Sequence, residues 1–195
     1  MDYRLQSALH EHGGFITVAQ GMKAGLSHTS ILRAVKAGFI ERVAHGVYGA
    51  VEEFDDVMYT NQLRRPKAVY SHGTALYLHN LTDRDPLSFS VTVPSGYNTK
   101  QLVSEGMTVF SVKKELHEIG IDKLLTKYGH TVITYCLERT VCDCVRSRSR
   151  MEAEIVTEAV KRYALRPDRD IHSLMKTANM FGVQKILRGY LEVLL

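Results

Sequence analysis

The 195-residue chain is poor in several residue types, and each shortage narrows what the protein can be. It has no tryptophan, four prolines and three cysteines, and none of its apolar runs approaches the ~20 residues that span a bilayer as a helix. The N-terminal stretch MDYRLQSALHEHGG lacks the apolar segment of a secretory signal peptide. Cys136, Cys142 and Cys144 are odd in number and close together, which suits a reducing compartment better than a disulfide framework. We therefore expect a cytoplasmic protein with no membrane association.

The chain also lacks the short motifs of common catalytic centres. It contains no glycine-rich phosphate loop with a lysine and no Gly-x-Ser-x-Gly nucleophile elbow. The run Cys142-Asp143-Cys144 has poor spacing for zinc, and no second pair of cysteines or histidines frames it. His72 and His79 have no carboxylate or nucleophile at a helpful spacing, so capping or core contacts explain them better than catalysis. These absences predict a protein that is not an enzyme and uses neither a cofactor nor a metal.

What the chain does contain is enough apolar sequence for a core and a small excess of positive charge. Hydrophobic residues make up 45% of it, and its formal net charge is +4. The length allows one large domain or two small ones. The basic excess is compatible with nucleic-acid binding but does not establish it.

The most informative stretch runs from Gly14 to Gly49, GFITVAQGMKAGLSHTSILRAVKAGFIERVAHGVYG. Thr17 and Gln20 have the spacing of a capping box, which predicts a helix that begins there. Gly25 tolerates the left-handed backbone of a tight turn, and the apolar Leu26 follows it. A second helix over residues 27–37 and a hairpin come next. This order predicts a winged helix-turn-helix, which is a DNA-binding module.

The second helix of this stretch has an apolar back and a polar, basic front. Ile31, Ala34 and Val35 fall on one face at helical spacing. A short polar front fits the major groove, and Arg33 is the best candidate to read a guanine because its fork donates two hydrogen bonds at once. The side chains expected to enter the groove are Ser27, His28, Thr29, Ser30, Arg33 and Lys36.

The hairpin that follows directly is expected to form the wing, with short strands at residues 39–43 and 46–48. Arg42 and His45 lie on it and are expected to touch phosphate or the minor groove, whereas Lys23 and Arg4 are expected to add contacts to the DNA backbone. The alternative is a winged helix with a purely structural or protein-binding role, because a lone helix-turn-helix pattern is weak evidence.

The rest of the chain predicts a second domain and an α+β fold class. We expect a winged helix-turn-helix DNA-binding domain at 1–50, a linker with a short helix at 51–66 and a C-terminal domain at 67–195. The linker begins with the acidic cluster Glu52, Glu53, Asp55 and Asp56, which is expected to be a solvated linker or the first turn of a helix, where carboxylates favour the helix dipole. The C-terminal domain is predicted to combine several helices with a small mixed or antiparallel sheet, whose strands are expected at 87–94, 107–112 and 131–136, with 116–125 as strand or loop.

Two charged sets in the C-terminal part leave alternatives open. Glu138, Arg139 and Asp143 come at the start of a predicted helix. A nuclease would need paired carboxylates and a lysine near a strand end, and no lysine follows at the needed place, so we favour an internal salt bridge. The basic run Arg146–Arg150 is expected to be a solvated loop, with phosphate contact as the alternative.

Several stretches, in this order, resemble the AbiEi-type antitoxin family of bacterial type IV toxin–antitoxin (abortive infection) systems. They are the winged-helix stretch above, RRPKAVYSHGTALYLHNLTDRDP, LSFSVTVPSG, LERTVCD and LRGYLEVLL. The resemblance implies an N-terminal winged helix that binds repeats in the promoter of its own operon. It also implies a C-terminal domain that is needed to neutralise a nucleotidyltransferase-like toxin encoded beside it, without a stable complex between the two proteins.

Three hypotheses follow for the function. The leading one is an autoregulating antitoxin that binds double-stranded DNA at inverted repeats in its own promoter, either as a monomer or as a dimer assembled on DNA. The second is a winged-helix transcriptional regulator whose C-terminal domain senses a ligand or dimerises. The third is an enzyme, such as a nuclease that depends on Glu138 or Asp143.

Overall fold

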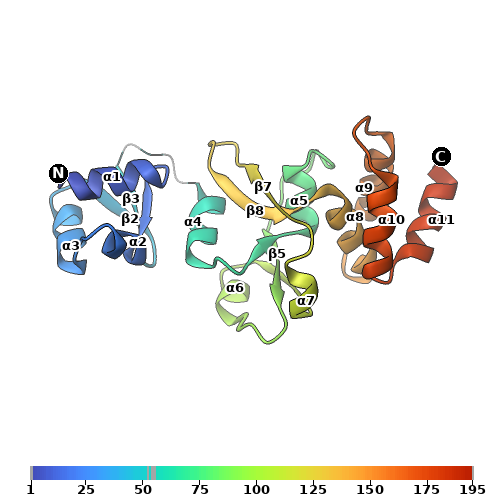
Figure 1. Cartoon of the computed structure of the whole chain (residues 1–195), viewed down its shortest axis with the longest axis horizontal. Helices are drawn as coiled ribbons and strands as arrows, with labels where there is room; N and C mark the ends of the chain where they lie inside the picture. Colours follow the sequence, from blue (N-terminus) through green and yellow to red (C-terminus); the bar gives the residue numbers. More distant parts are fainter. Residues whose placement is uncertain (1, 52, 54–55, 195) are drawn as a thin grey trace. The chain divides into compact units, whose positions relative to one another are not determined.

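The computed structural model describes residues 2–51, 53 and 56–194, so Glu52 and Asp55 of the acidic cluster lie outside the described residues. The chain combines helices with two sheets, which confirms the α+β class (Figure 1). It divides into two compact units. Unit 1 comprises Met1–Pro66 and Leu125–Val132, and unit 2 comprises Lys67–Leu124 and Ile133–Leu195.

Unit 1 contains the predicted helix-turn-helix and hairpin, and both are confirmed. Its strands form a three-stranded antiparallel sheet in the order β1-β3-β2. Side chains from the helices and the sheet, among them Leu5, Ile31 and Tyr48, share one buried core. The elements of unit 1 are α1 (Tyr3–Glu11), β1 (Phe15–Thr17), α2 (Val18–Lys23), α3 (His28–Lys36), β2 (Ile40–Ala44), β3 (Val47–Ala50) and α4 (Val57–Arg64).

Strand β1 was not predicted from the sequence, because it is too short to show an alternating pattern. Its last residue, Thr17, also caps α2. Phe15 pairs with Gly49, and a Cβ atom at Gly49 would lie 2.9 Å from the Phe15 ring. The glycine therefore lets the Phe15 ring lie close to the β3 backbone, and β1 adds a third strand to the hairpin of the wing.

The segment Leu125–Val132 belongs to unit 1 because it packs around the start of α4. Asp56 caps α4 by accepting a hydrogen bond from the Tyr59 N–H at 3.1 Å, and it is buried. Its carboxylate also accepts a hydrogen bond from the Thr126 hydroxyl and lies 2.9 Å from His130 Nδ1. The other ring nitrogen of His130 lies 2.8 Å from the Gly13 carbonyl oxygen. Asp56 therefore lies at the start of a helix, as the second expectation had it, but it is a buried anchor and not a solvated residue.

Unit 2 is built on a mixed five-stranded sheet in the order β6-β5-β4-β8-β7. The pairs β4–β8 and β5–β6 are parallel, and β4–β5 is antiparallel. The stretch predicted as strand or loop at 116–125 splits into a short helix and a strand. The strands are β4 (Val69–Tyr70), β5 (Ser90–Pro94), β6 (Thr108–Val112), β7 (Ile121–Leu125) and β8 (Thr131–Tyr135).

The helices of unit 2 gather around α8, which is buried at every position from Arg139 to Val145. Valines and leucines of the last three helices complete this core. No helix among the described residues is both long and apolar enough to cross a membrane. The helices of unit 2 are α5 (His72–Leu78), α6 (Lys100–Ser104), α7 (Lys114–His117), α8 (Leu137–Arg146), the 3-10 turn η1 (Arg148–Arg150), α9 (Ala153–Leu165), α10 (Ile171–Met180) and α11 (Gln184–Leu194).

Candidate nucleic-acid interface

The turn between α2 and α3 fixes how α3 is presented. The capping box at the start of α2 is complete: the Thr17 hydroxyl accepts a hydrogen bond from the Gln20 N–H, and the Gln20 side chain accepts one from the Thr17 N–H. Gly25 has a φ of +80°, a conformation that a side chain would strain. Leu26 is buried directly after it. The turn therefore ends α2 and starts α3 within four residues.

Helix α3 buries one face and leaves the opposite face free. Ile31 is fully buried, and Ala34 faces the same core. Opposite them, one helical turn apart, lie the exposed side chains of Thr29, Arg33 and Lys36. Within the described residues, neither Arg33 nor Lys36 forms an ion pair, so both cations are available to a ligand.

Leu32 also belongs to this outer face, although it was not among the side chains predicted to enter the groove. Its side chain is 44% exposed between Thr29 and Lys36, where a protein surface is usually polar. The sequence contained the signal for this placement. Leu32 is three residues after Thr29 and four residues before Lys36, and residues at these spacings lie on the same side of a helix. An exposed apolar side chain here suits the methyl group of a thymine.

The other residues expected at the start of α3 divide into two kinds. The Ser27 hydroxyl accepts a hydrogen bond from the Ser30 N–H at 3.0 Å, and the two hydroxyls lie 2.9 Å apart. Both serines therefore support the helix N-terminus. His28 is exposed in the first turn. The six predicted positions thus lie together on one short helix, but only four of their side chains are free of the cap.

The wing brings Arg42 and His45 together at its tip. Arg42 Nη2 lies 2.9 Å from His45 Nδ1, and Arg42 Nε donates a weak hydrogen bond to the Ala44 carbonyl at 3.4 Å. Since a guanidinium only donates, the His45 Nδ1 accepts in this contact. Both side chains are exposed. The pair forms a compact polar tip on the hairpin.

The two flanking cations differ in how free they are. Lys23 lies exposed in the last turn of α2. Arg4, in contrast, forms an ion pair with Asp2 at 2.9 Å and donates to the Gly25 carbonyl at 2.9 Å. The hydrogen bonds from Arg4 lower the pKa of the Asp2 carboxyl below its ordinary value. Arg4 therefore holds α1 to the turn, and its charge is already balanced.

The winged helix-turn-helix module, residues 3–51, is more basic than the chain as a whole. Residues 3–51 contain five basic and two acidic side chains, so the module carries most of the chain's positive excess. Of the two acidic side chains, Glu11 lies at the end of α1 and Glu41 on the wing. The outer face of α3 carries no carboxylate, which suits a polyanionic partner.

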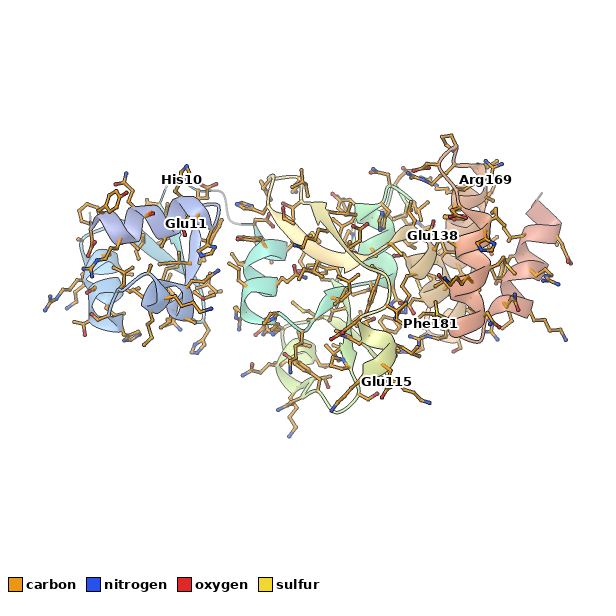
Figure 2. All side chains as sticks on the ribbon, in the orientation of Figure 1. His10, Glu11, Glu115, Glu138, Arg169 and Phe181 are labelled. Atoms are coloured by element: carbon orange, nitrogen blue, oxygen red, sulfur yellow. The ribbon has the colours of Figure 1, made fainter. Side chains whose placement is uncertain are left out.

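The charged set at the start of α8 is an internal salt bridge, as preferred over a nuclease site. Arg139 and Asp143 are fully buried, and Arg139 Nε donates to Asp143 at 2.8 Å. The guanidinium lies 3.8 Å from the centre of the Phe181 ring, and Glu138 accepts a hydrogen bond from Tyr163; Figure 2 labels Phe181 and Glu138. Within the described residues, no three histidine, cysteine or acidic side chains are grouped so as to hold a metal.

The basic run Arg146–Arg150 is less free than a solvated loop. Arg146 forms an ion pair with Asp143 at 3.2 Å, and Arg148 donates to the Val145 carbonyl at 3.2 Å. Arg150 donates to the Val109 carbonyl and lies over the Phe110 ring. The run thus stabilises unit 2, with all three arginines in contacts with its own residues.

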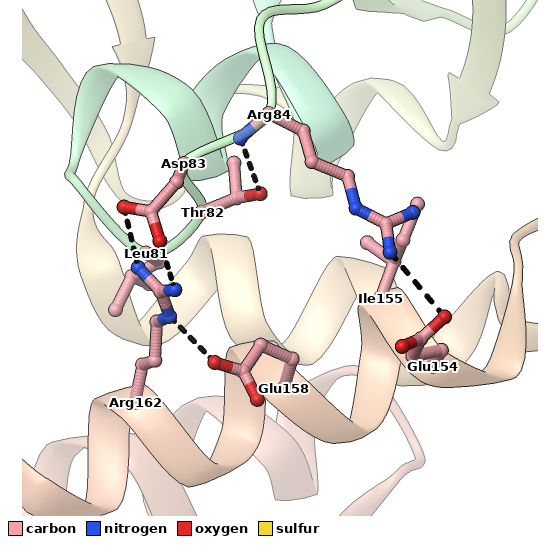
Figure 3. A pocket seen from close by; sticks show the side chains of 8 residues that line it. All are labelled: Leu81, Thr82, Asp83, Arg84, Glu154, Ile155, Glu158 and Arg162. Atoms are coloured by element: carbon pink, nitrogen blue, oxygen red, sulfur yellow. Dashed lines mark hydrogen bonds and ion pairs between the residues drawn. The ribbon is translucent and has the colours of Figure 1, made fainter.

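A hollow of about 250 Å³ lies between the loop after α5 and helix α9 (Figure 3). Arg162 is held by Asp83 and by Glu158, and Arg84 lies 3.3 Å from Glu154. The ion pair with Arg162 lowers the pKa of the Asp83 carboxyl. Each charge in the hollow is thus matched by its neighbour, and the site offers no unsatisfied group to a ligand.

The fold of unit 1 defines a winged helix-turn-helix module, and one comparison with known proteins shows which family this module resembles. Residues 3–51 match the family model described as "Transcriptional regulator, AbiEi antitoxin". The resemblance to the AbiEi-type antitoxin family is thereby confirmed over this segment. The winged helix-turn-helix of this chain is thus similar to the regulator module of that family.

The other comparisons add the fold. No match was found among curated proteins. The crystal structure of the RV2827C protein from Mycobacterium tuberculosis is similar to the chain with a TM-score of 0.50 and 10% sequence identity, and the match covers 97% of this chain and 80% of that one. At this identity the similarity shows a shared fold alone.

Proposed function

We propose that this protein is an autoregulating antitoxin of a type IV toxin–antitoxin system. It binds inverted repeats in its own promoter in the cytoplasm and represses the operon. Its C-terminal domain neutralises a nucleotidyltransferase-like toxin without a stable complex. The observation that supports the DNA role is the exposed outer face of α3, which has no carboxylate and carries two cations that form no ion pair with any residue the structure describes.

In this proposal the exposed face of α3 enters the major groove. Arg33 reads a guanine edge with its two-pronged fork, and Leu32 contacts a thymine methyl. Lys36 and Lys23 contact phosphates, which position the protein but carry no sequence information. The start of the helix is lined by Ser27, His28, Thr29 and Ser30. On the wing, Arg42 and His45 contact phosphate or the minor groove. Arg4 supports the turn and adds little to phosphate binding.

The first test is binding to the DNA upstream of this protein's own gene, compared with scrambled DNA of the same length at low and near-physiological salt. We expect a preference for the upstream fragment that persists at the higher salt. Arg33→Ala should cost roughly 1–3 kcal/mol and relax the preference, and Lys36→Ala should weaken all DNA about equally. Lys161→Ala removes an exposed lysine of α9 and is the matched control. Equal binding to both fragments would refute specific operator recognition.

A second candidate is a transcriptional regulator with no antitoxin role, since the family match covers the DNA-binding module and not unit 2. Co-expression with the neighbouring gene separates the two. An antitoxin restores growth of cells that express the toxin, whereas a plain regulator does not. The Arg33→Ala variant sharpens the comparison, because neutralisation by the C-terminal domain should survive the loss of operator binding.

A further inference from the structure

The last helix of unit 2, α11, has apolar side chains on two sides. Leu187 and Leu191 are buried in the core of the unit. A helix on the surface of a core ordinarily turns a polar face outward. Instead, Val193 is 86% exposed, at the end of a second apolar stripe with the spacing i, i+3, i+4 and i+7. This stripe lines a groove of about 380 Å³ against α9, formed by Thr157, Ile186, Gly189, Tyr190 and Val193.

Gly189 at the centre of the stripe is not explained by the packing of unit 2. Glycine is among the poorest residues in a helix interior. No described atom lies within 4 Å of the position that a Cβ atom would take there, so a larger side chain would fit. What the missing side chain does provide is a bare stretch of backbone, which lets a second helix approach closely.

The charges beside the stripe have a self-complementary order. Lys185 and Glu192 are seven residues apart, so they lie on the same flank of α11, and both are exposed. Neither forms an ion pair within the described part of the chain. Both also oppose the helix dipole, which favours carboxylates near the N-terminus and cations near the C-terminus. An intrahelical role therefore does not account for their placement.

We propose that this stripe docks against the same stripe of a second copy, with the two α11 helices antiparallel and a two-fold axis close to Gly189. In this arrangement the flank with Lys185 and Glu192 lies beside the same flank of the second copy, running in the opposite direction. Lys185 of each copy therefore lies opposite Glu192 of the other, which gives two ion pairs. In a parallel two-fold arrangement the two copies of this flank would lie on opposite sides of the interface, so neither charge would meet its complement. The antiparallel one also brings each lysine near the negative end of the opposite helix.

The dimer is weak in solution. Helix α11 has 11 residues and is about 16 Å long, so the contact is shorter than those of most stable dimers. A dissociation constant in the micromolar range or weaker is expected. Two linked DNA-binding modules bind paired half-sites more tightly than one, through effective concentration. The proposal itself does not depend on DNA binding, and its test uses the free protein.

The test is sedimentation equilibrium of the full chain without DNA, over a concentration series up to about 0.5 mM. The variants are K185E, E192K and the double swap K185E/E192K. Each single variant places like charges opposite one another, whereas the double swap restores two ion pairs. R188E is the matched control, because Arg188 is exposed on the same helix but points away from the stripe. Gly189→Gln fills the bare backbone with a side chain that the monomer accommodates.

We expect the wild type, R188E and the double swap to dimerise with similar constants. Each single charge variant and Gly189→Gln should weaken dimerisation at least tenfold, with unchanged circular dichroism. A wild-type protein that stays monomeric over the whole concentration range overturns the proposal and indicates that the stripe does not bind a second copy of this chain. A double swap that stays as weak as the single variants overturns the antiparallel arrangement.

Discussion

The salt dependence of DNA binding tests which basic side chains of the winged helix-turn-helix contact phosphates and which are held by contacts within the protein. Arg4, Lys23 and Lys36 look equivalent in the sequence. In the structure Arg4 is paired with Asp2 and bound to the Gly25 carbonyl, whereas Lys23 and Lys36 have no ion pair among the described residues. The perturbation is replacement of each by glutamine, which removes the charge and keeps a hydrogen-bonding end. Only a free cation should displace counterions from DNA.

The magnitude follows from the number of phosphate contacts. With Lys23, Lys36 and Arg42 on phosphates, the slope of log K against log salt should be about −2.7 for one module on one half-site. Affinity then falls roughly 40-fold between about 50 and 200 mM salt. Lys36→Gln should bring the slope to about −1.8, a roughly 12-fold fall over the same range. Arg4→Gln should leave the slope at about −2.7.

The assay is fluorescence anisotropy with a single half-site duplex at four or more salt concentrations, with thermal melts to show that the variants stay folded. An equal loss of slope in Arg4→Gln and Lys36→Gln would refute the view that the contact with Asp2 takes Arg4 out of phosphate binding. An unchanged slope in Lys36→Gln would refute the placement of the outer face of α3 against DNA.

Three further predictions concern single residues. Replacing one operator thymine by deoxyuridine removes a methyl group and should weaken wild-type binding about fourfold, the effect of about one buried methyl group. The Leu32→Ala protein should bind the thymine and deoxyuridine duplexes equally well. If Leu32→Ala is as sensitive to the replacement as the wild type, Leu32 does not contact that methyl group. Arg139→Met should lower the unfolding free energy by roughly 3–5 kcal/mol in urea titrations, because Asp143 stays buried and keeps only its longer ion pair with Arg146. The double variant with Asp143→Leu should recover part of this loss, and a cost below about 1 kcal/mol for Arg139→Met would contradict the buried pair. Burial lowers the pKa values of His72 and His79 in the folded state, so the unfolded chain binds protons that the folded chain does not, and the free energy of unfolding should fall as the pH drops through about 6.5. His79→Gln keeps a donor to the Tyr135 carbonyl and should reduce this pH dependence. If the pH dependence of the free energy of unfolding is unchanged in this variant, His79 is not one of its sources.

Much of unit 1 was predictable from short-range signals. The capping box at Thr17 and Gln20, the left-handed turn at Gly25 and the cap at Ser27 each involve residues within a few positions of one another. Such local hydrogen bonds form in any context that lets the helix form, so they can be read from the sequence. The two helices, the turn and the hairpin were predicted correctly for this reason.

The candidate site was predicted less completely than the fold around it. Periodicity placed Arg33 and Lys36 on the outer face of α3, but the same periodicity also places Leu32 there, which an apolar-inside rule assigns to the core. No pattern in the sequence indicated that Arg4 is held by Asp2 and the Gly25 carbonyl, because the second of these contacts spans 21 residues.

The sequence by itself determined the helix-turn-helix, the wing, the alternation of the main strands and the basic character of the α3 face. Only the tertiary structure decided which of these charges are free, that β1 pairs with β3 beside Gly49, and that Asp56 is a buried partner of His130, 74 residues away. It also decided that Arg139 and Asp143 form a core salt bridge. The physical reason is that caps, turns and periodicity depend on neighbours in the chain, whereas burial and charge pairing depend on neighbours in space.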